Sequence, residues 1–226
     1  MRSDLSPQAG EVSKRRKRRF YRTVIRRFDD DRPLIGVVFP CHQPHFENTW
    51  LFHSNRKHHM SFYDATVPAF LQILGSLTGI LNKAEAHGKA KNIAPEVLLG
   101  ARLYPDMLPL TRQIQIASDF AGKTCARLTG AEVPSTPDTE KTFDELKQRL
   151  ANTIDYVKAF KPEQFEGGEG RDITFPIGPT ERMTLKGQAY LSRVALPNFY
   201  FHAAIAHGIL RHNGVEIGKR DFLGVS

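Results

Sequence analysis

Three histidines near the C-terminus are the residues of this sequence best suited to chemistry. They are His202, His207 and His212, in a segment from Pro197 to Gly214 that reads as a helix closed by a glycine. Imidazole exchanges a proton near neutral pH and is a common ligand of transition metals. His207 and His212 come close to the predicted helix end, where a cation interacts favourably with the helix dipole, which favours a structural role for both. His202 is therefore the histidine that we consider for a functional site.

The residue pattern leaves three interpretations of His202 open. It is a buried histidine that hydrogen-bonds across the helices, a hydrogen-bond donor or proton carrier in a site beside Pro197, or a metal ligand. Its candidate ligand-binding partners are Asp106, Gln113, Asn198 and Tyr200. Asp106 also suits the N-cap of a helix. Cys125 is predicted to be a small core residue rather than a nucleophile.

Apolar residues spaced three and four apart predict three helices upstream of the histidine segment. Caps and breakers give their boundaries: Asp64 or Thr66 and then Gly88 for the first, Asp106 and Gly130 for the second, Thr139 or Thr142 and then Pro162 for the third. Val67, Phe70, Leu74, Leu77, Leu81 and Ala84 form the apolar face of the first helix, and Met107, Leu110, Ile114, Ala117, Ala121 and Leu128 that of the second.

The period changes between residues 171 and 186. Ile173, Phe175 and Ile177 alternate with polar residues, a Gly-Pro-Thr turn follows, and Met183 and Leu185 alternate again, which predicts a hairpin. A fourth helix is expected from about Gly187 to Asn213, kinked at Pro197. It is apolar almost all round, so we predict that it is the most buried helix. The fold class expected is all-α, a four-helix bundle with a short β-hairpin before the last helix.

The positive charge of the sequence is concentrated before residue 60. Residues 1–59 hold 13 Lys and Arg against 6 Asp and Glu, whereas residues 60–226 hold 19 against 18. We interpret residues 1–59 as a basic, disordered extension, which is not translated in the cell if Met60 is the natural start. Nucleic-acid binding is expected only if this extension is expressed. No apolar run is long enough to span a membrane, and two cysteines do not indicate a disulfide framework, so we expect a cytoplasmic protein.

Residues 60–226 resemble the DinB/YfiT-like superfamily of four-helix bundles, and within it a bacterial branch whose domain has no known function. The resemblance rests on the bundle order, on the hairpin, on the Asp106-Met107-x-Pro109-Leu110 start of helix two, and on the ending FxFHxxxAxxILRHNGVxIGKRDFLG from Phe199 to Gly224. Relatives in this superfamily include metal-dependent thiol-transfer enzymes, and its bundles often pair.

The resemblance implies a metal held by one histidine of helix two and by an HxxxH pair of the last helix. His202 matches the first histidine of that pair, but Ala206 stands at the second position, and His207 lies about 140° away around the helix. Between Gly88 and Phe201 the sequence has no histidine. We therefore predict no complete metal triad, and neither a metal nor another cofactor.

Two functions are left open. The first is a DinB-like protein that binds a small molecule near His202 without a complete metal triad. The alternative is a non-catalytic interaction or stress-associated protein that keeps the fold only. Whether a reaction is catalysed is left open, and pairing into a homodimer is expected from the superfamily.

Overall fold

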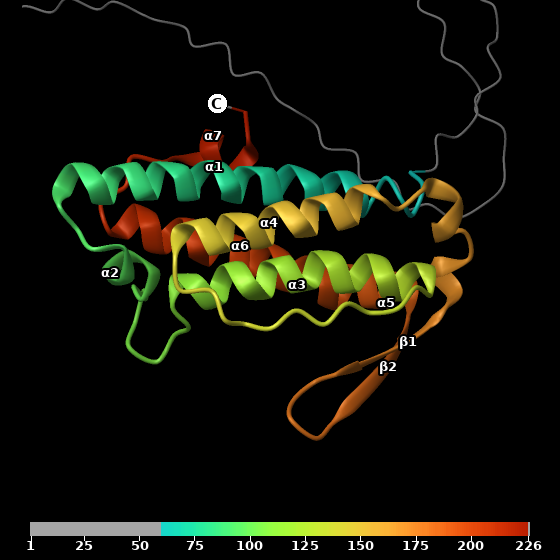
Figure 1. Ribbon diagram of the computed structural model, residues 1–226. Coiled ribbons are helices and arrows are strands. Elements are labelled where there is room, and N and C mark those ends of the chain that lie inside the picture. The colour runs from blue at the N-terminus through green and yellow to red at the C-terminus, as the bar shows by residue number, and fades with distance from the viewer. Residues whose placement is uncertain (1–59, 226) are drawn as a thin grey trace, which may run out of the picture. The chain divides into compact units, whose positions relative to one another are not determined.

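The computed structural model describes residues 60–225. Four long helical segments pack side by side as a bundle, and a short hairpin projects from one end (Figure 1). In chain order the elements are α1 (Val67–Lys91), α2 (Pro95–Leu99), α3 (Leu110–Thr129), α4 (Phe143–Lys158), the 3-10 turns η1 (Pro162–Phe165) and η2 (Gly168–Gly170), β1 (Asp172–Pro176), β2 (Arg182–Lys186), α5 (Gly187–Tyr190), the π-helical turn η3 (Leu191–Ala195), α6 (Leu196–His212) and α7 (Lys219–Leu223). The predictions about residues 1–59 fall outside the described residues.

The bundle confirms the predicted fold class. α3 packs against both α6 and α4, and α1 packs against α4 and α6. The two strands pair antiparallel, with Asp172 opposite Lys186 and Pro176 opposite Arg182. Within residues 60–225, no helix combines the length and the apolar character needed to cross a membrane.

The apolar face predicted for α1 is buried throughout, from Val67 to Ala84. The predicted end at Gly88 is wrong, because the helix continues to Lys91 and ends with Asn92 in the left-handed conformation at φ 53°. Gly88 is buried, and a Cβ there would lie 3.3 Å from the Ile93 carbonyl oxygen. The glycine therefore allows the chain to return closely over the helix, one turn before the helix stops.

The predicted caps are correct for the third long helix and wrong for the second. Thr142 accepts a hydrogen bond from the Glu145 N–H at 3.1 Å, and the Glu145 carboxylate accepts one from the Thr142 N–H at 3.0 Å. This is a complete capping box at the start of α4. α3 instead begins after Pro109, with Asp106 exposed in the preceding turn, so Asp106 is not its cap. The proline already fixes the extended backbone from which the helix starts.

The last helical segment is divided where Pro197 was expected to kink it. A π-helical turn, η3, lies between α5 and α6, and Leu196 separates it from the proline. Proline lacks an N–H and its ring crowds the carbonyl four residues before it, and a wider turn absorbs both effects.

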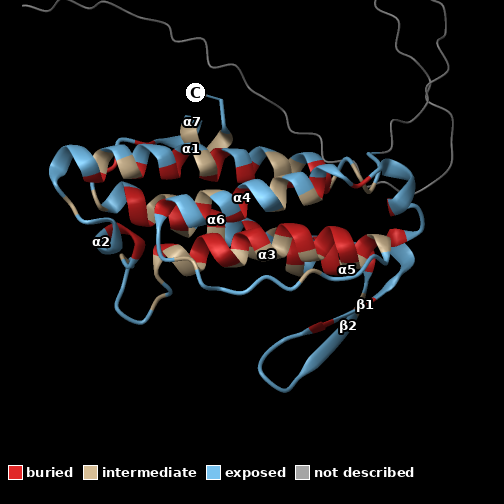
Figure 2. Ribbon diagram, viewed as in Figure 1, coloured by how far each residue is buried: buried red, intermediate tan, exposed pale blue. Residues whose placement is uncertain are grey.

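The prediction that the last helix is the most buried is wrong. In α6, 5 of 17 residues are buried, against 12 of 20 in α3 (Figure 2). The reason is that α3 contacts both α4 and α6, whereas one side of α6 leaves Tyr200 and Phe201 exposed.

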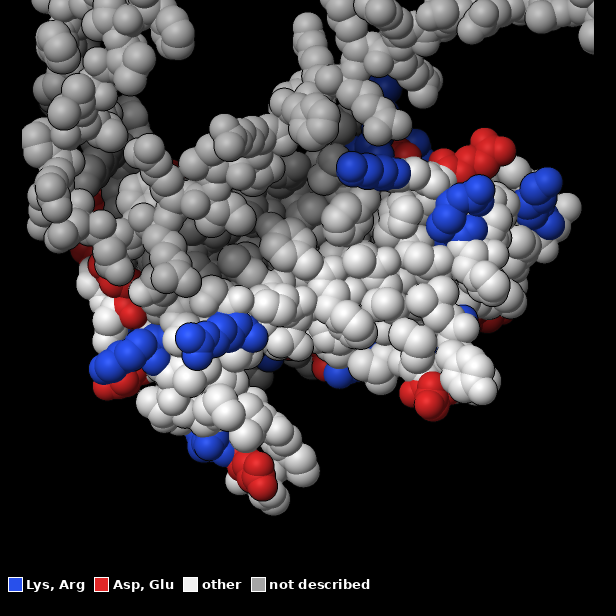
Figure 3. Space-filling model, turned by 180° about the vertical axis from the view of Figure 1, so that it is seen from behind, with Lys and Arg blue, Asp and Glu red and all other residues white. Residues whose placement is uncertain are grey.

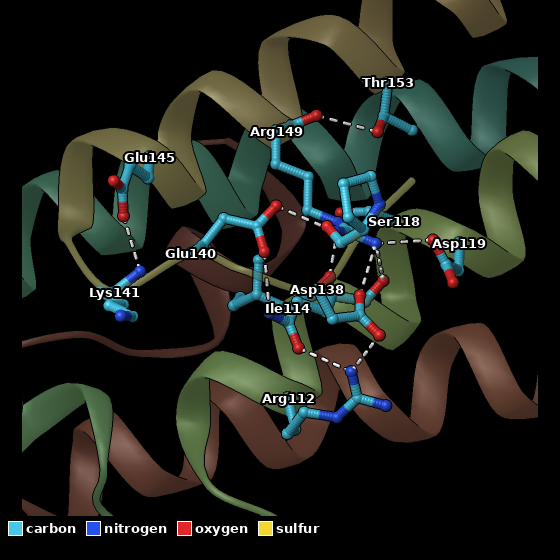
Figure 4. A network of polar contacts seen from close by, with 12 residues as sticks. Arg112, Ile114, Ser118, Asp119, Asp138, Glu140, Lys141, Glu145, Arg149 and Thr153 are labelled. Atoms are coloured by element: carbon cyan, nitrogen blue, oxygen red, sulfur yellow. Dashed lines mark hydrogen bonds and ion pairs between the residues drawn. The ribbon is translucent and has the colours of Figure 1, made fainter. Parts of the chain in front are cut away.

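A buried arginine joins α3, α4 and the segment between them (Figure 4). The side chain of Arg149 on α4 is 3% exposed and pairs with Asp119 at 2.7 Å, Glu140 at 2.9 Å and Asp138 at 3.1 Å. Burial raises the pKa of Glu140, but hydrogen bonds from Arg149, its own backbone and Gln115 outweigh this and hold the pKa below its ordinary value. Arg149 is therefore paired with carboxylates in spite of its burial, and its ion pair with Asp119 holds α4 against α3.

Candidate functional site

His202 on α6 contacts Gln113 in the first turn of α3. Its Nδ1 lies 2.7 Å from Gln113 Oε1, and Gln113 is 2% exposed. Gln113 Nε2 donates to the Leu108 carbonyl at 3.0 Å, which turns Oε1 toward the imidazole. Oε1 can only accept, so the histidine Nδ1 carries the proton and donates. The pair leaves Nε2 of His202 unprotonated, with its lone pair free.

The surroundings of His202 keep the ring neutral. Burial, and then the charge of Arg112, lower the pKa of His202 below its ordinary value. The ring stacks on Phe120 with centroids 6.4 Å apart and meets the edge of Phe201 at 5.2 Å. Within residues 60–225, every fully buried side-chain nitrogen or oxygen has a hydrogen-bond partner. In the same part of the chain, Nε2 of His202 has no such partner, so this atom is not fully buried and solvent reaches it. It can accept a hydrogen bond or a proton from a molecule placed beside it.

The other candidate residues do not contact His202 through polar atoms in the part of the chain described. Asn198, one turn before it, donates from Nδ2 to the Val194 carbonyl at 2.7 Å. Tyr200 is 38% exposed and packs edge-on against Phe199, and burial raises its pKa. Asp106 is exposed before α3. Of the four candidate partners, Gln113 alone forms a hydrogen bond with His202.

A groove of about 340 Å³ runs along α3 from the region of His202 toward the hairpin. One wall is a row on α3 at helical spacing, Ile116, Phe120, Lys123 and Arg127. The facing wall comes from the last helical segment through Tyr190, Val194 and Asn198, and β1 covers one end with Phe175 and Pro176. Phe120 links the two features, because it lines the groove and stacks on His202. His202 is not among the side chains that line the groove, and Phe120 is the residue through which the groove and the imidazole are in contact.

Sequence reasoning missed most of this groove. The spacing of Ile116, Phe120, Lys123 and Arg127 was visible, but such a mixed row resembles an ordinary half-exposed helix face. The hairpin residues come from another part of the chain, and nothing in their alternation tells which helix they face. Of the candidate site residues predicted from the sequence, only Asn198 lines this groove.

Cys125 lies on α3 but is fully buried, as predicted for a core residue. Burial raises the pKa of its thiol to about 12, so the reactive thiolate does not form near neutral pH.

Comparison with known proteins assigns the family. The model of a domain of unknown function, DUF1993, matches residues 62–223. The chain belongs to this family. A crystal structure of a DinB family member protein from Shewanella denitrificans is 42% identical, covers 73% of this chain and 92% of that chain, and superposes with a TM-score of 0.68. No curated protein matches the sequence. The resemblance of this DUF1993 domain to the DinB bundles is thereby confirmed.

The donor set of this DUF1993 domain does not fit the three-histidine centre that the DinB resemblance implies. The position one helical turn after His202 is Ala206, a fully buried methyl group. α3 contributes Gln113, whose Oε1 already accepts from His202. Within residues 60–225 no group of three or more His, Cys, Asp or Glu side chains is arranged to hold a metal ion. One imidazole and one engaged amide are too few donors for such a centre.

Proposed function

We propose that the protein binds a small organic molecule in the groove between α3, the last helical segment and β1, beside His202. The observation that supports this proposal is the stacking of Phe120, which lines the groove, on the imidazole of His202. A volume of about 340 Å³ falls in the range of small-ligand sites, which combine apolar walls with a few polar groups.

His202 would act in this site as a hydrogen-bond acceptor. The proton on Nδ1 is held by Gln113, and the lowered pKa keeps the ring neutral, so Nε2 presents a lone pair near neutral pH. A hydroxyl, an amide N–H or a thiol at the near end of the groove could donate to it. Gln113 would be the residue that orients the imidazole.

The test is a substitution that fills the groove with a larger side chain from one wall. Val194 is half-buried and lines the groove, whereas its neighbour Arg193 is exposed and does not. Ligand-observed NMR with a library of small aromatic and aliphatic fragments should identify binders of the full chain. These fragments are expected to lose binding to Val194→Trp and to keep binding to Arg193→Trp, with both variants folded by circular dichroism. Equal binding to the two variants would contradict the proposal.

A second candidate, a non-catalytic interaction protein that forms a homodimer, is favoured by exposed aromatic side chains on α6. Phe201 is 55% exposed and Tyr200 is 38% exposed. On the face seen in Figure 3, charged side chains lie mainly toward the edges and uncharged ones occupy much of the middle. Light scattering should then give a dimer that Phe201→Glu converts to a monomer. A wild-type monomer at high concentration would remove this candidate.

A further inference from the structure

The far end of the groove holds a cation whose charge no carboxylate neutralises. Arg127 lines the groove on α3 and forms no ion pair with any Asp or Glu among residues 60–225. One of its N–H groups donates to the Tyr190 hydroxyl at 2.9 Å, and its guanidinium lies 5.8 Å from the centre of that ring. A hydrogen bond to a hydroxyl does not neutralise a guanidinium, so Arg127 keeps its positive charge for a ligand.

Lys123, the other cation of the groove, differs from Arg127 in this respect. Its Nζ pairs with Asp119 at 2.6 Å, and the same carboxylate also pairs with Arg149 at 2.7 Å. The lysine is therefore neutralised by a carboxylate that is itself held in the buried network. Counted over its lining side chains, the groove carries one unbalanced positive charge, located at Arg127.

Apolar side chains line the groove between Arg127 and the His202 end, beside the ion pair of Lys123 with Asp119. Phe120 and Val194 contribute from facing walls, and Phe175 covers the end near the hairpin with its ring 5.0 Å from that of Tyr190. A guanidinium is always ionised and donates from a planar fork that matches a carboxylate. Apolar walls beside it exclude water and strengthen its attraction for an anion.

We infer that this groove binds an organic monocarboxylate, with the carboxylate at Arg127 and an apolar or aromatic body between Phe120, Phe175 and Val194. The inference rests on the proposed small-molecule site and adds the chemical class and the orientation of its ligand. A phosphate monoester fits less well, because its second negative charge would meet one cation only, with the Asp119 carboxylate lining the same groove.

The orientation assigns different roles to the two ends of the site. The carboxylate end lies near the hairpin, and the body of the ligand extends along α3 toward Asn198 and Phe120, the residue that stacks on His202. Monocarboxylates with a hydrogen-bond donor at the distal end of the body are therefore expected to bind more tightly than those without one.

The experiment is calorimetric titration of the full chain with three matched probes, 3-phenylpropionate, its neutral amide 3-phenylpropionamide, and phenyl phosphate. 3-Phenylpropionate should bind most tightly, by roughly tenfold over the amide, since a hydrogen-bonded charge contributes about that much. Arg127→Gln should remove this preference, and Arg127→Lys should keep part of it. Arg193→Gln, at an exposed arginine outside the groove, is the control, and circular dichroism checks that each variant is folded.

Each result bears on the inference. If 3-phenylpropionate and the amide bind equally, or if Arg127→Gln leaves the preference intact, the carboxylate assignment is wrong while the small-molecule site stands. Tighter binding of phenyl phosphate would likewise overturn it. If none of the probes binds at millimolar concentration, the carboxylate assignment fails, and the fragment screen with Val194→Trp then decides separately whether the groove binds small molecules at all.

Discussion

Replacing His202 with alanine tests the hydrogen bond at the near end of the groove. The substitution leaves Oε1 of Gln113 without its donor, and Gln113 is 2% exposed. A buried acceptor left unsatisfied costs about 1–3 kcal/mol. Alanine is the better helix former, which returns roughly 0.5 kcal/mol in α6. The free energy of unfolding should therefore fall by about 0.5–2.5 kcal/mol at neutral pH.

Urea denaturation followed by circular dichroism measures this loss. His212→Ala is the matched control, because His212 is exposed in the last turn of the same helix and should change stability little. A double-mutant cycle with Gln113→Leu isolates the pair, since His202→Ala should cost less once the amide is gone. If His202→Ala is as stable as the wild type, the imidazole contributes nothing through Gln113, and the reasoning about the Nδ1 proton is refuted.

Four further predictions follow from the same structure. Arg149→Leu should lower the free energy of unfolding by about 2 kcal/mol in urea, because Glu140 loses the cation it pairs with while Asp119 and Asp138 keep Lys123 and Arg112, and a loss below about 1 kcal/mol would contradict the network. As the pH falls from the ordinary histidine value through the lowered pKa of His202, stability should decrease, since the unfolded chain binds the proton more readily; a pH titration of His202→Ala should lack this component. Hydrogen bonds from Lys147 and Lys89 lower the pKa of Glu85 to about 2, so its contribution is present above pH 4.5 and lost between 4.5 and about 2, a loss that Glu85→Gln should remove from the acid denaturation curve. A chain that begins at Met60 should melt within about two degrees of the full chain by calorimetry, because the apolar core described lies after that residue.

The fold could be predicted from the sequence because the signals for its helices, apolar spacing and capping residues, lie within a few positions of one another. Three-and-four spacing marked the buried face from Val67 to Ala84, and Thr142 with Glu145 marked the start of α4 through contacts three residues apart. The errors occurred where tertiary packing, rather than local sequence, determines the structure. The sequence predicts a helix stop at Gly88, but the helix continues to Lys91, and the glycine instead allows the close approach of Ile93.

The candidate site was predictable only in part. Gln113 and His202 were paired as candidates, and they lie in contact although 89 positions separate them. Arg127 was missed, because a charged residue on a helix is usually solvated and only the fold places Tyr190 and Phe175 beside it. Asp106 was named for its position before a helix, and it is exposed there. Sequence patterns give helix faces, whereas the walls of a groove come from elements that only tertiary packing brings together.

The most direct test of the proposed site is a crystal structure of the full chain soaked with the fragments that bind in solution. The account predicts ligand density in the groove between Phe120 and Val194, extending toward Asn198 and within hydrogen-bond distance of His202 Nε2 whenever the fragment carries a donor. Density found only elsewhere on the bundle, with this groove filled by its own side chains, would contradict the account.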